Sequence, residues 1–419
     1  MEETIAYLTN YTKDRENAYF VLDGKEIILK PSISIEEKTF VKGFVENKIF
    51  NITHYWKPSK EELLTFMAQT EQKIEIFKPP LFKSIEKAAR KIKTAKLFRR
   101  QCLIRFHNDA DGIVSCFLIS QAINAIKIPQ HSAIYSVKEA LNDIPRLKYG
   151  ELPLCIFLDF GCSKECKDAY EILKADEIEI MIIDHHPVDE EIKELAFIVN
   201  PLLENFTAEH TTGYLCKEIL DVLGITSYYN YRISLAGDKS SFPYDENDKK
   251  IALALDYAAF HVNPQNALDI YHEILKNENF AISLANKAEE AIQESVEEMK
   301  KKAKKFLINN IAFYYLDTEQ EEKSFPPSGK IATYFAETIE EPALVAGCSS
   351  NFCSFRLSKS AKEKDLINLN DFVKSLKEKS SIIESGGGHK FAASIKIKDK
   401  NLVLPLILET LKDFLNKTL

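Results

Sequence analysis

The 419-residue chain lacks any stretch of about 18 uncharged apolar residues, so it predicts no membrane-spanning helix. Its first residues, MEETIAYLTNYTKDRENAYF, contain neither a basic leader nor an apolar segment of signal-peptide length. We therefore expect a cytoplasmic protein without a membrane partner. Internal repeats and low-complexity tracts are also missing, and 45% hydrophobic with 28% charged residues excludes disordered and collagen-like chains. The length predicts two or three domains.

Cysteine motifs are absent as well. The chain has eight cysteines but no CxxC pair and no Cys/His spacing of a zinc site. Most of the cysteines lie in apolar runs, so we expect free, buried thiols in a reducing compartment.

An excess of positive charge is missing too. The formal net charge is −8, which excludes a protein that is basic all over and coats nucleic acid. A local basic segment is present between residues 83 and 105, where Glu86 is the single acid. Such a run is usually a solvated helix face, but this one could guide nucleic acid by neutralising phosphates. Phe98, Phe106 and Phe242 are candidates for base stacking, although core packing is favoured for Phe106.

The first 80 residues form a separate predicted unit. YFVLDGKEIILKPSI alternates like a strand on either side of an Asp-Gly turn and predicts a hairpin. A charged helical stretch from Lys60 to about Glu75 follows, and Pro79–Pro80 ends the unit. We find no chemistry in residues 1–80 and interpret them as an accessory domain or as a docking domain for a replication or repair protein.

Residues 81–263 predict an α/β domain. CLIRFHND, CIFLDFGC and IMIIDHHP are short apolar runs separated by helical patterns of about 15 residues, as in a parallel sheet buried on both faces. Residues 264–305 contain no glycine and predict one or two long linking helices. Residues 306–419 predict a smaller α/β domain with a helix near 370–379 and a closing amphipathic helix.

Acidic and histidine residues follow the predicted strands directly. The clusters are His107-Asn108-Asp109-Ala110-Asp111-Gly112, then Asp159, then Asp184-His185-His186-Pro187, and finally Asp238 in SLAGDKSS. Each cluster alone could be a solvated turn or a helix cap, but their combination is specific. Working residues lie beyond the carboxyl ends of parallel strands, so we expect these side chains to converge. So many carboxylates and imidazoles would repel one another without a cation, and such mixed ligands suit Mn²⁺ and related ions. The pattern predicts two metals that share one carboxylate, roughly 3.5–4 Å apart.

FHNDADG, LDFG, IIDHHP and LAGD, followed by GGGHKFAAS, resemble the four motifs of the DHH phosphoesterase superfamily and the glycine-rich signature of its DHHA1 domain. The resemblance covers about residues 84–419. The pattern looks most like the RecJ-like exonucleases in their archaeal form, because the first motif begins with His107 where bacterial RecJ has Asp.

The resemblance implies a role for each cluster. It assigns one Mn²⁺ to His107, Asp109 and Asp159. It assigns a second Mn²⁺ to Asp111, Asp159, His185 and Asp238, and Mg²⁺ or Co²⁺ are possible substitutes. Asp184 would orient an imidazole, and His186 would contact the scissile phosphate.

Ser385-Gly386-Gly387-Gly388-His389-Lys390 precedes a predicted strand. Three glycines let backbone N–H groups close on an anion, although such a turn alone could be a flexible hairpin. The resemblance implies that Gly386, Gly387, Gly388 and His389 hold substrate phosphates opposite the metals. Arg356 is a candidate second phosphate contact, or otherwise an ordinary surface arginine.

These observations favour a two-metal phosphodiesterase that digests single-stranded DNA or RNA from its ends, in replication or repair. An alternative is a nano-RNA or cyclic-dinucleotide-derived phosphodiesterase of the same superfamily, which needs neither the basic segment nor the N-terminal unit. A second alternative is a replisome scaffold with accessory nuclease activity. Loss of metal ligands would indicate a scaffold, and this sequence retains them all.

Overall fold

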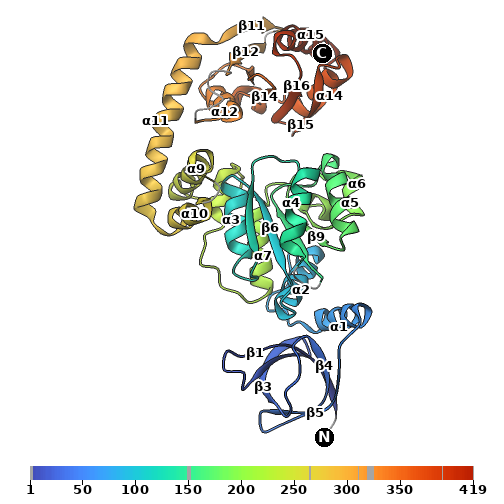
Figure 1. Cartoon of the computed structure of the whole chain (residues 1–419). Helices are drawn as coiled ribbons and strands as arrows, with labels where there is room; N and C mark the ends of the chain where they lie inside the picture. The colour runs from blue at the N-terminus through green and yellow to red at the C-terminus, as the bar shows by residue number, and fades with distance from the viewer. Residues whose placement is uncertain are drawn as a thin grey trace. The chain divides into compact units, whose positions relative to one another are not determined.

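The computed structural model describes residues 3–148, 152–263, 266–309, 311–318, 325–388 and 390–418. The chain packs into two compact units, Met1–Glu278 and Asn279–Leu419 (Figure 1). Across the described residues, no helix is both long and apolar enough to cross a bilayer. The narrower domain limits expected from the sequence, 1–80, 81–263, 264–305 and 306–419, stay predictions.

The first unit begins with a closed barrel of five strands. The strands are β1 (Thr4–Tyr11), β2 (Ala18–Leu22), β3 (Lys25–Pro31), β4 (Thr39–Glu46) and β5 (Ile49–Trp56), joined in the order β1-β2-β3-β5-β4. The predicted hairpin is confirmed as β2 and β3, whose turn residues Asp23 and Gly24 both have positive φ. The sequence did not predict the closed barrel, because closure depends on pairing between strands that are distant in the chain.

Helix α1 (Lys60–Lys73) follows the barrel where a helix was expected. Ser59 and Glu62 form a capping box at its first turn, which satisfies backbone N–H groups that the helix leaves free. Leu63 and Met67 pack against Tyr7 and Phe40 on the outside of the barrel. This apolar contact fixes the helix to the barrel.

A five-stranded parallel sheet forms the centre of the first unit. Its strands are β6 (Cys102–His107), β7 (Ile126–Gln130), β8 (Leu154–Leu158), β9 (Glu179–Ile183) and β10 (Phe197–Val199). The spatial order β10-β9-β8-β6-β7 means that the chain leaves β6 for β7 and then returns to β8 on the other side. The topological switch therefore lies between β6 and β8, which is where open α/β sheets place their ligands.

Helices surround this sheet, as the continuously apolar strands predict. They are α2 (Lys83–Leu97), α3 (Ala110–Ile119), α4 (Val137–Leu147), α5 (Lys167–Ala175), α6 (Glu190–Lys193), α7 (Thr212–Val222), α8 (Arg232–Gly237), α9 (Glu246–His261) and α10 (Ala267–Lys276). The expected linking helices are confirmed as α10 and the 25-residue α11 (Glu278–Lys302).

The second unit contains a six-stranded sheet in the order β11-β12-β13-β14-β16-β15. The strands are β11 (Lys304–Ile308), β12 (Ile311–Asp317), β13 (Ala343–Cys348), β14 (Phe352–Leu357), β15 (Ile383–Gly388) and β16 (Ala392–Ile397). One pair, β12 with β13, is parallel and the other pairs are antiparallel. The helices are α12 (Ser328–Glu337), α13 (Lys359–Glu363), α14 (Leu369–Lys379) and α15 (Val403–Thr418), which confirms the two expected from the sequence.

Two expectations for this unit are wrong. Cys348 and Cys353 face each other on β13 and β14 and are joined by a disulfide, whereas the other six cysteines are buried thiols as predicted. The glycines of the expected turn, Gly386 to Gly388, are part of the edge strand β15 and pair with β16. Both differences arise from strand register, which brings together residues that local sequence patterns do not relate.

Candidate metal centre

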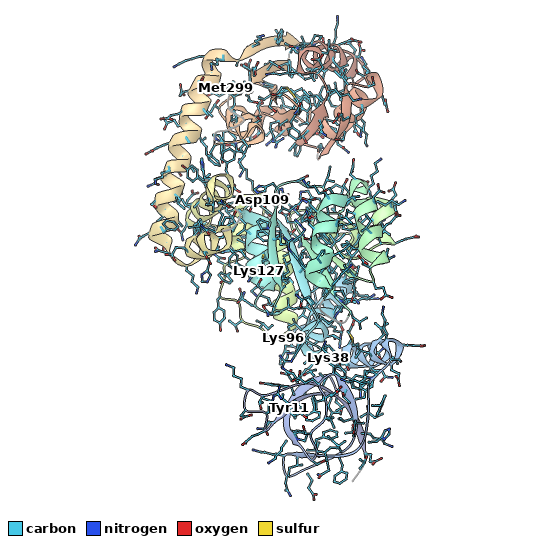
Figure 2. The ribbon with its side chains drawn as sticks, in the orientation of Figure 1. Tyr11, Lys38, Lys96, Asp109, Lys127 and Met299 are labelled. Carbon is cyan, nitrogen blue, oxygen red and sulfur yellow. A yellow bond between two sulfur atoms is a disulfide. The ribbon has the colours of Figure 1, made fainter. Side chains whose placement is uncertain are left out.

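The predicted metal ligands lie at the carboxyl edge of the parallel sheet. His107 ends β6, Asp109 is the N-cap of α3, and Asp159 follows β8. His185 follows β9, and Asp238 is the C-cap of α8. Asp109 is labelled at this edge in Figure 2. The topology therefore gathers side chains from five segments at the switch between β6 and β8.

The first group of possible ligands consists of His107, Asp109 and Asp159, whose ligand atoms all lie within 4.8 Å of one another. His107 Nδ1 is 2.6 Å from Asp109 Oδ2 and 3.6 Å from Asp159 Oδ2. The turn between His107 and Asp109 is tight, because a Cβ on Gly112 would lie 2.1 Å from the His107 carbonyl oxygen. This grouping coincides with the first ligand set that the resemblance implies.

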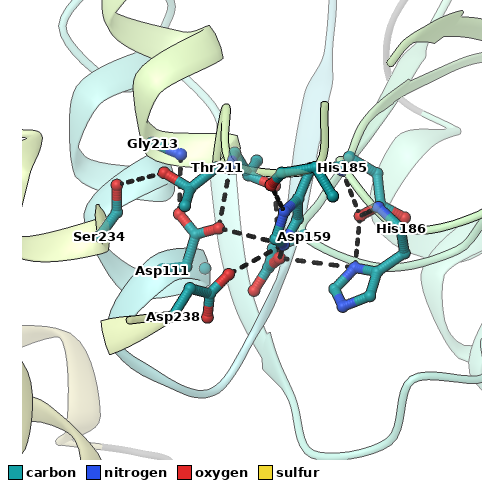
Figure 3. A network of polar contacts seen from close by, with 12 residues as sticks. Asp111, Asp159, His185, His186, Thr211, Gly213, Ser234 and Asp238 are labelled. Carbon is teal, nitrogen blue, oxygen red and sulfur yellow. Dashed lines mark hydrogen bonds and ion pairs between the residues drawn. The ribbon is translucent and has the colours of Figure 1, made fainter. Parts of the chain in front are cut away.

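The second group consists of Asp111, Asp159, His185 and Asp238, and it coincides with the second implied set. His185 Nε2 lies 2.9 Å from Asp238 Oδ2, 3.4 Å from Asp159 Oδ1 and 3.8 Å from Asp111 Oδ2 (Figure 3). Asp159 is the member that both groups share, with one oxygen directed to each imidazole. A shared carboxylate is the arrangement expected of a two-metal site.

The hydrogen bonding of His185 fits a cation ligand. Its Nδ1 is 2.7 Å from the Ala208 carbonyl oxygen, which can only accept, so Nδ1 carries the proton. Nε2 is then a lone-pair donor, and it is buried without a hydrogen-bond partner among the described residues. A buried nitrogen that faces three carboxylates is favourable only when it carries a proton or when a metal cation lies between it and the carboxylates. The residues therefore fit a divalent metal ion.

Helix α7 holds the buried carboxylate of Asp111. The backbone N–H groups of Thr212 and Gly213, at the first turn of α7, donate to it at 2.9 and 2.7 Å. Ser115 Oγ donates to the same carboxylate at 3.3 Å. The partial positive charge of a helix N-terminus favours an anion at this place. Gly213 is required, because a Cβ there would lie 2.3 Å from Ser234 Oγ.

Asp159 has an unusual backbone. Its φ is +65°, in the left-handed region that residues with a side chain rarely adopt, and the residue is 2% exposed. Its N–H donates to the Ile183 carbonyl oxygen at 3.0 Å, and Thr212 Oγ1 donates to its Oδ1 at 3.3 Å. Strain of this kind persists where surrounding contacts fix the backbone, and it is common at functional sites.

Asp184 fixes the position of His186. Asp184 Oδ1 accepts hydrogen bonds from the backbone N–H of His185 at 2.8 Å and of His186 at 3.2 Å, and it is 2.8 Å from His186 Nδ1. Because Nδ1–H of His186 donates to Asp184, the other ring nitrogen, Nε2, points away from Asp184. The His186 side chain is 45% exposed. The geometry matches the implied orienting role of Asp184, and the imidazole that it orients is His186.

Crowding shifts the pKa values of these groups. Burial, together with nearby carboxylates that include Asp159 and Asp238, raises the pKa of Asp111 well above its usual range. Burial and Asp109 also raise the pKa of Asp159. Burial alone would lower the pKa of His185, but Asp159, Asp238 and Asp111 raise it well above the ordinary value. A cluster that retains protons when empty is one that a cation can stabilise by replacing them.

His107 and Asp184 show the same competition. Burial alone would lower the pKa of His107, but Asp109 and Asp159 raise it well above the ordinary value. Burial alone would raise the pKa of Asp184, yet His186 and the backbone hydrogen bonds hold it below the usual range. Asp184 therefore stays charged and can orient a protonated His186, whose own pKa Asp184 raises against the effect of burial.

Sequence reasoning missed residues that support the ligands. Asn108 Nδ2 donates to the Ala259 carbonyl oxygen at 3.1 Å, and Tyr271 donates its hydroxyl to Asn108 Oδ1 at 2.7 Å. These bonds join helices α9 and α10 to the His107–Asp109 turn. Gly213 was also missed, although its neighbours Thr211 and Thr212 form a typical N-cap signal before an apolar helix.

The predicted phosphate contacts lie in the second unit. Arg356, on β14, donates from Nε to Thr333 Oγ1 at 2.9 Å and from Nη1 to the Phe355 carbonyl oxygen at 2.8 Å. Gly387 in β15 has open space where a Cβ would stand. His389 lies outside the described residues. The roles of Arg356 and the glycines remain predictions.

Part of the basic segment is used in contacts within the protein. Arg90 donates to the Ile74 carbonyl oxygen at 2.6 Å and pairs with Glu86. Lys91 and Arg100 both pair with Glu179, at 2.6 and 2.7 Å. The buried Arg105 donates twice to Asp143. These four cations therefore contact other parts of the same unit, whereas Lys83, Lys87 and Lys96 are exposed, and the guide role stays a prediction.

The aromatic candidates divide in the same way. Phe106 is fully buried, as favoured, and Phe98 packs against Tyr7 and Phe66. Phe242 is half-buried near Asp238 and remains available for a ligand. The end of α2 that carries Lys96 precedes β6, so it lies at the edge of the sheet opposite the metal ligands (Figure 2).

Residues 101–233 match the family model described as the DHH family, N-terminal domain. An uncharacterized protein of Methanocaldococcus jannaschii is 24% identical in an alignment of 404 positions, which covers 78% of this chain. This chain covers 53% of the length of that relative. The matched range contains all of the possible metal ligands described above except Asp238.

Solved structures share the fold. A DHH domain, described as belonging to a family of ribosomal proteins, has a TM-score of 0.71 at 23% identity, covering 84% of this chain and 97% of its own. RecJ from Thermus thermophilus in complex with Mn²⁺ has a TM-score of 0.55 at 13% identity, covering 82% of this chain and 57% of its own. An exonuclease RecJ bound to manganese has a TM-score of 0.51 at 14% identity, covering 81% of this chain and 96% of its own.

Proposed function

We propose that this chain, a DHH-superfamily protein with a RecJ-like fold, is a metal-dependent phosphodiesterase that removes nucleotides from the ends of single-stranded DNA or RNA. The observation that carries the proposal is the position of Asp159. It lies at the topological switch and belongs to both groups of possible ligands, with one oxygen near His107 and the other near His185. Two crystallised RecJ proteins of the same fold are described with manganese, and one is described as an exonuclease.

Two divalent ions would be held by the two groups of ligands, with Asp159 common to both. Mixed carboxylate and imidazole ligands favour Mn²⁺, and Mg²⁺ or Co²⁺ can substitute. Ions bound there would activate water for attack on phosphorus and offset the charge of the phosphate.

The neighbouring residues would position the substrate. Asp184 holds His186 by Nδ1, so that the Nε2–H of the half-exposed ring can donate to a phosphate oxygen. Asp184 also raises the pKa of His186, which favours the donor form near neutral pH. A positioned cationic donor stabilises the charge that develops on the phosphate oxygens.

A dinucleotide or nano-RNA phosphodiesterase is the second candidate. One observation favours it: the basic segment expected to guide a long strand is partly used in internal ion pairs. The N-terminal barrel favours the longer substrate or a protein partner, because a small-molecule phosphodiesterase needs no such unit. Docking of a replication or repair protein on residues 1–80 stays part of the proposal.

The experiment compares cleavage of an end-labelled single-stranded 20-mer with cleavage of a dinucleotide by the full chain in Mn²⁺. We expect processing of the 20-mer, and loss of activity on chelation and in Asp159→Asn. Asp168→Asn, which changes an exposed carboxylate on α5, is the matched control and should retain activity. Cleavage of the dinucleotide alone would select the second candidate. Activity that survives Asp159→Asn would overturn the proposed metal site.

A further inference from the structure

Four aromatic rings form a continuous ridge beside the metal cluster. They are Phe206, His210, Tyr214 and Phe242, and all four are half-buried. Phe206 and His210 have ring centroids 5.3 Å apart, and His210 lies 4.8 Å from Phe242. Tyr214 lies 5.3 Å from His210 and 5.6 Å from Phe242. The three contacts of His210 are edge-to-face and the Tyr214–Phe242 contact is tilted, and together they hold the rings in place while part of each stays accessible.

The segments that carry the ridge also support the metal ligands. Ala208, between Phe206 and His210, is the residue whose carbonyl oxygen fixes the His185 ring at 2.7 Å. Asp238 precedes Phe242 by four residues, which is at most about 14 Å along an extended chain. The ridge therefore lies next to the possible ligands, and its rings cannot move independently of them.

Hydrogen bonds tie these two segments together. Ser240 Oγ donates to the Glu209 carbonyl oxygen at 2.9 Å, and the Ser241 N–H donates to the Glu209 carboxylate. The Phe242 N–H donates to Ser240 Oγ at 3.1 Å. Phe242 is thus placed by the same contacts that join the loop after Asp238 to the segment before α7 that contains Glu209.

The carboxylates that border the ridge are already used inside the protein. Glu204 accepts from the Ser84 N–H at 3.3 Å, and Glu218 pairs with Lys78 at 3.1 Å. Burial alone would raise the pKa of Glu209, but its hydrogen bonds to Ser241 and Ser240 hold it below the usual range. Glu218 is therefore paired with a cation, and Glu204 and Glu209 accept hydrogen bonds from donors within the protein.

We propose that this ridge, centred on His210 and Phe242, is a stacking platform for the bases of a single-stranded nucleic acid whose phosphate reaches the metal cluster. The inference rests on the proposed function and deepens it, because it names a surface that recognises the base. Planar, partly exposed rings bind any base, so the platform would select unpaired strands without selecting sequence. The free base faces that it needs are absent from a paired duplex.

The test separates base recognition from phosphate recognition. Its ligands are a fluorescent single strand and the same strand with abasic residues near the end, both with phosphorothioate linkages that resist hydrolysis. Fluorescence anisotropy gives the Kd of each strand for the full chain in Mn²⁺. We expect Phe242→Ala to weaken binding of the base-bearing strand by about tenfold, in line with the usual contribution of one stacked base. Binding of the abasic strand should not change.

Two further variants test whether the effect depends on an aromatic ring at position 242. Phe242→Trp preserves a stacking surface and should restore tight binding of the base-bearing strand. Tyr228→Ala removes an aromatic side chain that is 87% exposed elsewhere in the unit, and it should leave both Kd values unchanged. Equal loss for both strands in Phe242→Ala, or no loss for either, would overturn the stacking platform.

Cleavage of the unmodified strand by the wild type is measured in parallel. Absence of cleavage with selective binding intact would refute the proposed nuclease and leave the platform standing. Cleavage that proceeds without any preference for the base-bearing strand would refute the platform and leave the nuclease standing.

Discussion

Gly213 donates its backbone N–H to Asp111 Oδ1 at 2.7 Å, across a sequence separation of 102 residues. The bond joins the first turn of α7 to a carboxylate of the second ligand group. A Cβ at Gly213 would lie 2.3 Å from Ser234 Oγ and 3.2 Å from Asp111 Oδ1, so any larger residue must displace one of them.

Gly213→Ala should therefore lower Mn²⁺ affinity by about tenfold or more, which is the usual effect of disturbing a residue that supports a metal ligand. Isothermal titration calorimetry measures the affinity. Gly387→Ala, where an added Cβ meets nothing within 4 Å, is the matched control. Unchanged Mn²⁺ binding in Gly213→Ala would show that Asp111 is not a ligand.

Asp159→Asn should stabilise the metal-free protein. Asparagine adopts the left-handed backbone of this position readily, so the substitution removes charge without adding strain. The lost carboxylate is buried beside Asp111 and Asp109, whose charges it opposes. In chelator, scanning fluorimetry should show a higher Tm for Asp159→Asn than for the wild type. Added Mn²⁺ should raise the Tm of the wild type but not that of Asp159→Asn. A lower Tm in chelator would contradict the picture of mutual repulsion.

The stability of the metal-free protein should fall as pH rises. Asp111, Asp159, His107 and His185 all have raised pKa values, so the folded state binds more protons than the unfolded chain does. This contribution is complete below the unfolded values, 3.8 for Asp and 6.5 for His, and it is lost as pH rises through the raised folded values.

Manganese should have the opposite dependence, because its ligands must first lose their protons. Urea unfolding at about pH 5.5 and about pH 8, on either side of the ordinary histidine pKa, measures both effects with chelator and with Mn²⁺. The stabilisation that Mn²⁺ provides should be larger at the higher pH. A metal effect that is independent of pH would argue against protonatable ligands.

Asp184→Asn should change catalysis more than metal binding. The amide oxygen can still accept from His186, but the charge that raises the pKa of His186 is lost. If the protonated ring assists the reaction, the alkaline limb of the kcat/KM profile should move to lower pH. Mn²⁺ affinity, measured by calorimetry, should stay close to that of the wild type. An unshifted alkaline limb would remove His186 from the proposed role.

Tyr271→Phe should destabilise the turn of the first ligand group. The Tyr271 side chain is fully buried, and its hydroxyl donates to Asn108 Oδ1 at 2.7 Å. Its loss leaves a partly buried amide oxygen without that donor, which costs about 1–3 kcal/mol of unfolding free energy. Urea unfolding measures the change, and Tyr228→Phe at an exposed site is the control. Equal stability of both variants would contradict this assignment.

The metal cluster is the part of the protein that local sequence predicted best. Each ligand follows a short apolar run or a helix, and a parallel sheet brings the carboxyl ends of its strands to one edge. The order of strands and motifs therefore predicts by itself that His107, Asp159 and His185 converge. The supporting bonds of Gly213, Ala208 and Tyr271 were not predictable, because they depend on how helices pack against that edge.

Local sequence was enough to predict the strands β6, β8 and β9 of the central parallel sheet and the residues at the working edge of that sheet, whereas the edge strands β7 and β10 were not predicted. These follow from short-range periodicity and from chain connectivity, which are local properties. Long-range packing decided that Lys91 and Arg100 pair with Glu179 and that the first five strands close into a barrel, and the register of the β13–β14 hairpin decided that Cys348 meets Cys353. Those outcomes depend on residues that are distant along the chain or on the register of paired strands. Short-range sequence patterns specify neither.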